Sequence, residues 1–225
     1  MSQLFYNVIE DEYVLTNVGI ICVVLIILIL FALALLFYRR FHKPAKDRPK
    51  HTPVRQIVFS GAAMALGIIT SEFIPTITMP MGGSITLFSM FFIVLIGYWY
   101  GLGAGLSTAL AYGLLQFVLD PKFISIPQIL LDYVFAFGAL GLSGLFANRK
   151  HGLVWGYLTG VAGRFFFSWL AGFLIWGMYA PQGTPAALYS LTYQASYLVP
   201  EAILTLIILV IPPVQNGLNA VKKLT

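Results

Sequence analysis

Long apolar runs alternate along this sequence with short polar segments that are rich in glycine and proline. A helix needs about 20 apolar residues to cross the hydrocarbon core of a bilayer. Helical spans are therefore predicted at 14–38, 56–73, 84–98, 102–119, 126–147, 152–178 and 187–211. The first run is too long for the core of a signal peptide, and no small-residue cleavage site follows it, so we expect it to be retained. The pattern predicts an all-α integral membrane protein.

The composition identifies lipid as the solvent of these runs. Hydrophobic residues make up 59% of the chain and charged residues only 9%, whereas soluble domains contain roughly 25% charged residues. Cys22 is the one cysteine, which excludes a disulfide framework and a cysteine metal site.

The positions of lysine and arginine predict the topology, because these residues gather on the cytoplasmic side of membrane proteins. A dense basic group lies between residues 39 and 55, and basic pairs follow at 149–150 and 222–223. Seven spans with the N-terminus outside and the C-terminus inside place all three groups in the cytoplasm. The predicted organisation is an extra N-terminal transmembrane helix (1–38), a basic cytoplasmic linker (39–55), a six-helix core (56–214) and a cytoplasmic tail (215–225).

This topology leaves three outer connections, at about 74–83, 119–126 and 179–187. They are rich in proline, glycine, threonine and aromatic residues, whereas the inner connections of the core are short. Loops on a rigid scaffold commonly carry function. We therefore expect a ligand site that opens to the outer face.

Ionisable residues inside spans are costly and point to function. Asp132 shares a helical face with Gln128, and its carboxylate could bind an amine on a ligand, pair with Arg164, or do both. Glu201 could fill the backbone gap left by Pro200 or contact a ligand. Glu72 fits a solvated helix end, and a role in ligand binding is the alternative.

Aromatic residues crowd the outer ends of the spans, where an interfacial belt accounts for most of them. Tyr133, Trp176 and Tyr189 differ because they lie near the Asp132 carboxylate or beside an outer loop. Aromatic faces beside an acid suit a flat, cationic organic ligand.

Small residues at helical spacing permit close packing of helices in lipid. Gly61 and Ala65 could serve such packing or form a flat face for a partner membrane protein. Gly141, Ser143 and Gly144 match the G-x-S-G pattern of intramembrane serine proteases, but the histidine base that such an enzyme needs is missing from the spans. No nucleotide or metal motif appears, so a transporter of this sequence would need a gradient or a partner ATPase.

Four segments together resemble a known family. They are PMGGSITLFSM (80–90), QILLDYVFAFGALGLSGLF (128–146), GRFFFSWLAGFLIWGMYAPQG (163–183) and YSLTYQASYLVPE (189–201). From Arg55 onward the chain resembles the thiamine-specific S component of energy-coupling factor (ECF) vitamin transporters. The resemblance implies a six-helix substrate-binding subunit, a transmembrane coupling subunit and two ATPase subunits.

The resemblance also implies site residues. The acid–tyrosine pair of the family falls on Asp132 and Tyr133, its basic residue on Arg164, its stacking tryptophan on Trp176 and a binding tyrosine on Tyr189. Family positions are changed at Ser168, Gln194, Gly83 and Leu87, where the best-known member has histidine, asparagine, tryptophan and glutamate. The docking face of the family for the coupling subunit falls on Gly61 and Ala65.

The sequence therefore predicts a bacterial cell-membrane protein that captures thiamine or a close analogue outside the cell for ATP-driven uptake. It predicts no catalytic residue, no cofactor, no metal and no nucleic-acid partner. Two alternatives remain at this point: an S component for another flat vitamin or precursor, such as riboflavin, and an intramembrane enzyme or scaffold.

Overall fold

The computed structural model describes residues 6–9, 12–15, 18, 21, 25, 53–74, 77–79, 83–122 and 125–224. Strands β1 (Tyr6–Ile9) and β2 (Glu12–Leu15) pair antiparallel, so the first two residues of the predicted helix 14–38 lie in a strand. Val18, Ile21 and Leu25 are helical and exposed. The rest of that helix, and the linker up to residue 52, lie outside the described residues.

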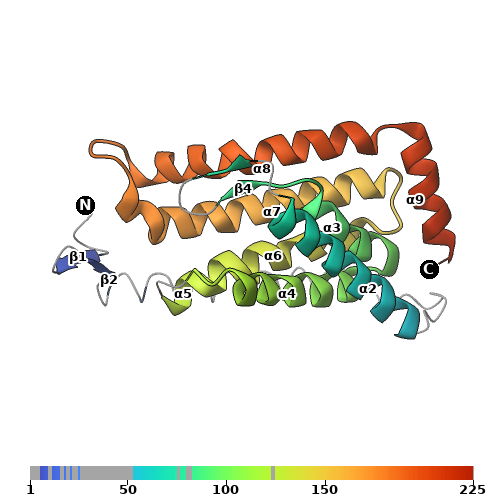
Figure 1. Cartoon of the computed structure of the whole chain (residues 1–225), viewed down its shortest axis with the longest axis horizontal. Coiled ribbons are helices and arrows are strands. Elements are labelled where there is room, and N and C mark those ends of the chain that lie inside the picture. The colour runs from blue at the N-terminus through green and yellow to red at the C-terminus, as the bar shows by residue number, and fades with distance from the viewer. Residues whose placement is uncertain are drawn as a thin grey trace.

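The core is built almost entirely of helices, which follow one another in the order shown in Figure 1. Their bounds are α2 Pro53–Ile68, η2 Ile69–Phe73, α3 Ser89–Tyr100, α4 Leu102–Leu119, α5 Ile126–Ile129, η4 Leu130–Phe135, α6 Ala136–Gly138, η5 Ala139–Phe146, α7 Gly152–Leu174, η6 Trp176–Tyr179, α8 Ala186–Leu209 and α9 Pro212–Leu224. Here η2 and η4 are π-helical, and η5 and η6 are 3₁₀-helical. The short strands β3 (Ile77–Thr78) and β4 (Ser84–Ile85) pair antiparallel between η2 and α3.

Four described helical segments are long and apolar enough to cross a membrane: Val54–Phe73, Leu102–Leu119, Ile126–Phe146 and Ala186–Leu209. Each coincides with a predicted span, and Ser89–Tyr100 is a shorter apolar helix. The 23-residue α7 has sufficient length but carries Arg164 and is not among the four.

One predicted helix start was wrong, and one predicted segment has more structure than the sequence indicated. The span predicted from residue 84 begins as helix only at Ser89, because Ser84 and Ile85 pair with β3. The segment predicted as a cytoplasmic tail from residue 215 lies in α9, which begins at Pro212, and its cytoplasmic location stays a prediction.

One half of the bundle packs through residues that have almost no side chain. A Cβ atom on Gly141 of η5 would lie 2.5 Å from the carbonyl carbon of Gly105 on α4, and one on Gly97 of α3 would lie 2.1 Å from Ser143 Oγ. Ser143 is fully buried and donates to the Val94 carbonyl oxygen at 2.9 Å. Its role is therefore packing, as the missing histidine base predicted.

Helix α9 lies across the end of this packed half, near the start of α2 (Figure 1). Tyr98 donates to Asn219 at 3.2 Å, and the Lys222 ammonium lies 3.6 Å from the centre of the Tyr98 ring. Arg55 of α2 donates to the Leu224 carbonyl oxygen at 2.7 Å. Burial beside this ring lowers the pKa of Lys222.

Candidate functional site

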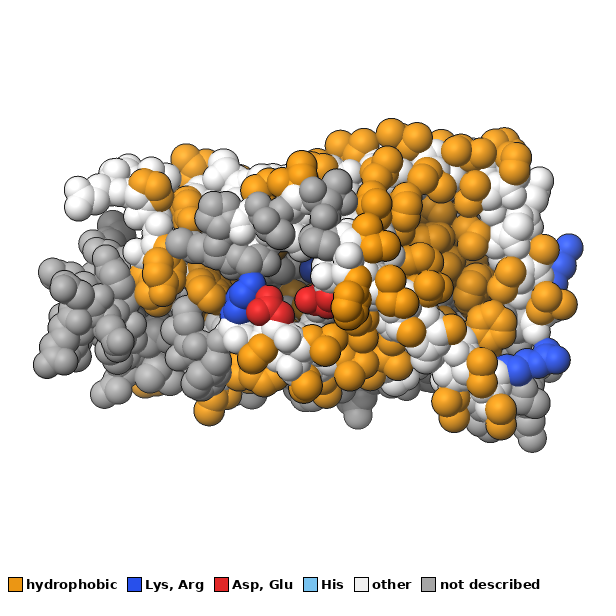
Figure 2. Space-filling view, viewed as in Figure 1, with side chains coloured by type: hydrophobic (Ala, Val, Ile, Leu, Met, Phe, Trp, Pro, Cys, Tyr) orange, Lys and Arg blue, Asp and Glu red, His pale blue; other side chains and the backbone are white. Residues whose placement is uncertain are grey.

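A cavity of about 360 Å³ lies in the other half of the bundle. Its lining comes from η2, β4, α3, α4, η4, α6, α7, η6 and α8, so most of the bundle contributes to one space. Figure 2 shows charged side chains gathered around a hollow in a face that is otherwise largely hydrophobic. A polar cavity between apolar helices is a typical small-molecule site.

The structure brings all eight predicted ligand residues to this cavity. They come from β4 and its flank, from the segment at 130–135, and from three further helical elements: Gly83, Asp132, Tyr133, Arg164, Ser168, Trp176, Tyr189 and Gln194. Their contact with a ligand stays a prediction, but all eight residues line the same cavity, as a shared ligand site requires.

Asp132 is held by two donors that both bind the same carboxylate oxygen. Gln128 Nε2 and the indole Nε1 of Trp176 each lie 2.9 Å from Asp132 Oδ2. The predicted shared face of Gln128 and Asp132 is therefore confirmed. Among the described residues, no donor is recorded on Oδ1, so this oxygen is available to a ligand.

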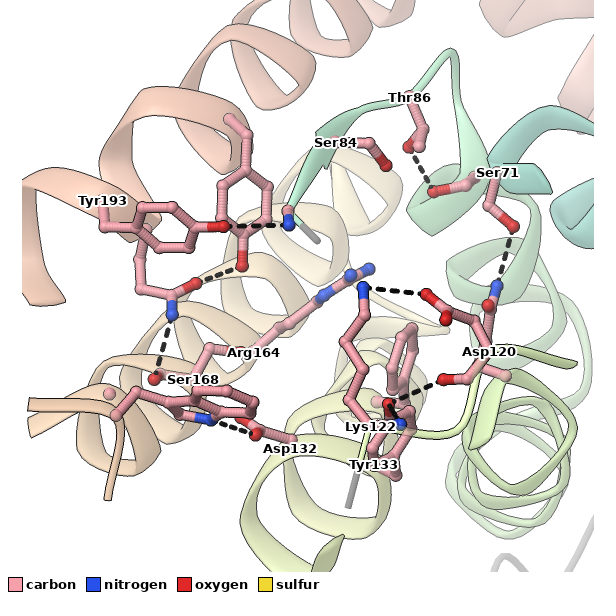
Figure 3. A pocket seen from close by; sticks show the side chains of 18 of the residues that line it. Ser71, Ser84, Thr86, Asp120, Lys122, Asp132, Tyr133, Arg164, Ser168 and Tyr193 are labelled. Atoms are coloured by element: carbon pink, nitrogen blue, oxygen red, sulfur yellow. Dashed lines mark hydrogen bonds and ion pairs between the residues drawn. The ribbon is translucent and has the colours of Figure 1, made fainter. Parts of the chain in front are cut away.

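Arg164 enters the cavity from α7 (Figure 3) without the ion pair that the sequence left open. Its guanidinium carbon lies 4.3 Å from the centre of the Phe137 ring. Within the described ranges, the recorded ion pair joins Asp120 to Lys122, and buried Nη1 of Arg164 has no hydrogen-bond partner. A buried donor of this kind is costly to leave unsatisfied, so Arg164 offers the cavity an unused cationic group.

Tyr133 has its hydroxyl committed to the loop after α4. It donates to the Asp120 carbonyl oxygen at 3.0 Å and accepts from the Lys122 amide at 3.2 Å. Its ring stacks near Phe137. Tyr133 therefore presents a ring to the cavity, and its hydroxyl holds the loop.

Helices α7 and α8 are joined beside the cavity by side chains that bind backbone carbonyls. Gln194 Nε2 donates to the Ser168 carbonyl oxygen at 3.2 Å, and Ser190 Oγ donates to that of Trp169 at 2.8 Å. Tyr197 donates to Gln194 Oε1, so both ends of the Gln194 amide are engaged. Gln194 therefore holds the cavity wall in place, and its amide is already used in bonds within the protein.

Three tyrosines stand four residues apart on α8, and the sequence singled out only the first. Tyr189 and Tyr193 stack at 6.2 Å, and Tyr193 meets Tyr197 edge-on at 5.7 Å. Tyr193 OH accepts from the Gly83 amide at 2.9 Å, and a Cβ on Gly83 would lie 2.8 Å from both phenol groups. The spacing of four along one helix face could have identified Tyr193 and Tyr197.

Polar groups on η2 and α4, which the sequence did not connect, close the opposite wall. Gln116 Nε2 donates to Ser71 Oγ at 2.7 Å and to Tyr112 OH at 2.6 Å. Glu72 is exposed, as expected for a solvated helix end, and it also lines the cavity. Both π-helical turns of the described chain thus contribute lining residues, in keeping with the frequent occurrence of such turns at functional sites.

Glu201 does not bind the backbone gap at Pro200, so this suggestion from the sequence was wrong. The Glu201 carboxyl group is hydrogen-bonded to Thr86 Oγ1 at 2.6 Å, to Ser89 Oγ at 3.1 Å and to the Met90 amide at 3.3 Å.

The predicted docking residues lie on the outside of the bundle, away from the lining. Gly61 and Ala65 are exposed, and a Cβ on Gly61 would meet nothing within 4 Å. The span that contains them is only 11% buried. Docking itself stays a prediction.

Comparison with known proteins shows a consistent set of relatives. The family model described as "Thiamine transporter protein" matches residues 54–219. The thiamine transporter ThiT of Bacillus subtilis is 37% identical over 166 residues, which cover 68% of this chain and 84% of that protein. ThiT of Lacticaseibacillus paracasei is 31% identical over 94 residues, covering 36% of this chain and 47% of that protein. A solved structure of ThiT from Listeria monocytogenes matches with a TM-score of 0.53 and 27% identity, over 71% of this chain and 93% of that chain.

Proposed function

The chain belongs to the thiamine transporter protein family, and we propose that it is the substrate-binding S component of an ECF-type importer. It captures thiamine, or a close analogue, at the outer face of the bacterial cell membrane. ATP hydrolysis by partner subunits then drives uptake. Membership of a transporter family makes the chain a membrane transport component and not an enzyme.

The observation that carries this proposal is the arrangement of Asp132. Its Oδ2 is fixed by Gln128 and Trp176, and its Oδ1 accepts no recorded hydrogen bond from the described chain. Thiamine has an amino group on its pyrimidine ring, which is a suitable donor for that oxygen. A charge-assisted hydrogen bond of this kind is strong and directional.

The remaining lining matches the rest of the ligand. The rings of Tyr133, Trp176 and Tyr189 provide faces for the flat pyrimidine and the cationic thiazolium. Arg164 meets the polar tail through its unpartnered Nη1.

The balance of charge in the cavity also suits a monocation. Asp120 and Lys122 pair with each other at 2.9 Å, which leaves two lining acids, Asp132 and Glu72, against one base, Arg164. In their ordinary ionised forms these three side chains sum to one negative charge.

A binding titration tests this function directly. The full chain is purified in detergent, and its tryptophan fluorescence is followed as thiamine, riboflavin or biotin is added. Because Trp176 lines the cavity, thiamine should quench the fluorescence saturably, while biotin should not. Saturable binding of riboflavin alone would move the assignment to another vitamin, and absence of binding by all three would reject it.

The coupling partner is tested separately on α2. Ala65→Leu should reduce recovery of the coupling subunit and both ATPases with the tagged chain while leaving thiamine binding intact. Leu66→Phe is the control, because Leu66 is also exposed on α2 but lies about 100° around the helix from Ala65. Equal recovery with both variants would reject this docking face.

A further inference from the structure

Glu201 is a buried acid outside the cavity lining, and the proposed contacts with thiamine do not use it. It lies in the middle of α8, is 2% exposed, and makes no recorded ion pair with any described residue. An acid inside an apolar helix is costly. Its position therefore requires a specific set of partners.

Those partners all belong to one short segment that forms part of the cavity wall. The hydroxyl groups of Thr86 and Ser89 are hydrogen-bonded to different oxygens of Glu201, and the Met90 amide donates to Oε1. Thr86 and Ser89 themselves line the cavity. The acid consequently joins the wall segment 84–90 to α8 from behind.

Strand β4 fixes the first two residues of this segment by pairing with β3, but the part that leads into α3 has no side-chain cap of its own. Phe88, the residue before α3, has a left-handed conformation with φ of 65° and provides no side-chain cap. The first amides of a helix need acceptors from elsewhere, and the Met90 amide obtains one from Glu201 across the bundle. Figure 3 shows the Thr86 side chain hydrogen-bonded at the edge of the pocket.

The number of protons on the two hydroxyl groups indicates whether ionised or protonated Glu201 fits these contacts. Three oxygen–oxygen contacts close a ring: Thr86 to Ser89 at 2.7 Å, Thr86 to Oε2 at 2.6 Å and Ser89 to Oε1 at 3.1 Å. Each hydroxyl group has one proton to donate, so two hydroxyls cannot fill three contacts. A protonated carboxyl group supplies the third proton: its Oε2–H group donates to Thr86, Thr86 donates to Ser89, and Ser89 and the Met90 amide donate to Oε1.

We propose that Glu201, in its protonated form, is a positioning residue that fixes the wall segment 84–90 of the thiamine cavity to α8. The proposal rests on the proposed function only for its effect on the ligand. Loss of the acid should loosen the wall and accelerate ligand release. The amide of glutamine, which has both a donor and an acceptor, should replace the protonated acid.

The first test needs no ligand. Hydrogen exchange of the amides in 84–90 is measured by mass spectrometry on the full chain in detergent. Glu201→Leu should accelerate exchange by roughly tenfold or more, whereas Glu201→Gln should retain the slow exchange of the original chain. Thr205→Val is the matched control, because Thr205 is buried one turn away on α8 and its hydroxyl donates to the Glu201 backbone carbonyl and not to the wall segment.

The second test is the rate of thiamine release, measured by stopped-flow fluorescence. Glu201→Leu should raise this rate about tenfold, while Glu201→Gln and Thr205→Val leave it within about threefold. If Glu201→Leu fails to fold, the double variant Thr86→Val with Ser89→Ala removes the same bonds from the wall side. Unchanged exchange in 84–90 after removal of these bonds, or a Gln variant that behaves like Leu, would overturn the proposal. If thiamine does not bind the original chain, the proposed function fails, while the exchange result still decides the role of Glu201.

Discussion

The two halves of the bundle use the same helices for opposite purposes. In the packed half, glycines bring the backbones of α3, α4 and η5 together so closely that a Cβ on Gly141 would lie 2.5 Å from Gly105. In the cavity half, the same continuous helix from Ile126 to Phe146 presents Asp132 and Tyr133 to an open space. One helix is therefore anchored at one end and free to shape a site at the other.

The difference also lies in how polar groups are used. Ser143, in the packed half, has one neighbouring carbonyl as its partner. Asp132 and Arg164, in the cavity half, each retain an atom without a recorded partner in the described chain. Because unsatisfied buried groups cost stability, we infer that the rigid half compensates for the polar site.

The largest expected effect comes from breaking the packed half. Gly141→Val should lower the free energy of unfolding by about 3 kcal/mol, because the new side chain would meet the backbone of α4, which cannot rotate away. Thermal unfolding in detergent measures it. Gly61→Ala is the control, since its Cβ meets nothing within 4 Å, and a similar loss there would show that any added methyl group destabilises the bundle.

The next effect should appear in binding and not in stability. Asp132→Asn should weaken thiamine binding by about 2 kcal/mol, or roughly 30-fold in Kd, because it removes a charged acceptor from the cavity. Isothermal titration calorimetry measures it. Asp120→Asn should change Kd far less, because Asp120 is half-exposed and already pairs with Lys122. Equal losses in both variants would mean that overall charge, and not the position of Asp132, governs affinity.

Trp176→Phe should give a smaller loss of thiamine affinity, about 1 kcal/mol. The substitution keeps an aromatic face but removes the N–H that donates to Asp132 Oδ2. Calorimetry is again the measurement, because the substitution removes a fluorophore. A loss as large as that of Asp132→Asn would indicate that the indole face contributes more than the N–H.

The smallest expected effect is a change in stability at α9 that leaves thiamine binding in the cavity half unchanged. Lys222→Met removes a cation–π contact with Tyr98 and a hydrogen bond to the Ala147 carbonyl oxygen, so stability should fall by about 0.5–1 kcal/mol with thiamine Kd unchanged. Lys223→Met, at the exposed neighbouring position, should change neither. A changed Kd in Lys222→Met would show that α9 is coupled to the cavity.

Apolar runs predicted the four described helical segments that are long and apolar enough to cross a membrane, because a span needs a long apolar helix and such a run is visible in the sequence. The prediction failed at 84–88, where strand β4 and Phe88 in a left-handed conformation precede α3. A two-residue strand and the backbone conformation of a single residue do not change the hydropathy of the sequence. The family resemblance, now confirmed, located the eight cavity residues. It did not indicate that Glu201 reaches Thr86, because contacts between residues 115 positions apart depend on the folded arrangement.

The π-helical turn at Leu130–Phe135 makes the cavity sensitive to chain length. Such a turn holds one residue more than the α-helical turn it replaces. Deleting Val134 would restore a regular helix and rotate everything before it by about 100° relative to the glycine-packed part. A single deletion could thus redirect Gln128 and Asp132 together, away from the cavity or toward a different ligand, while the anchored end keeps its sequence. Insertions and deletions, as well as substitutions, are therefore a route by which binding preference can diverge on this scaffold.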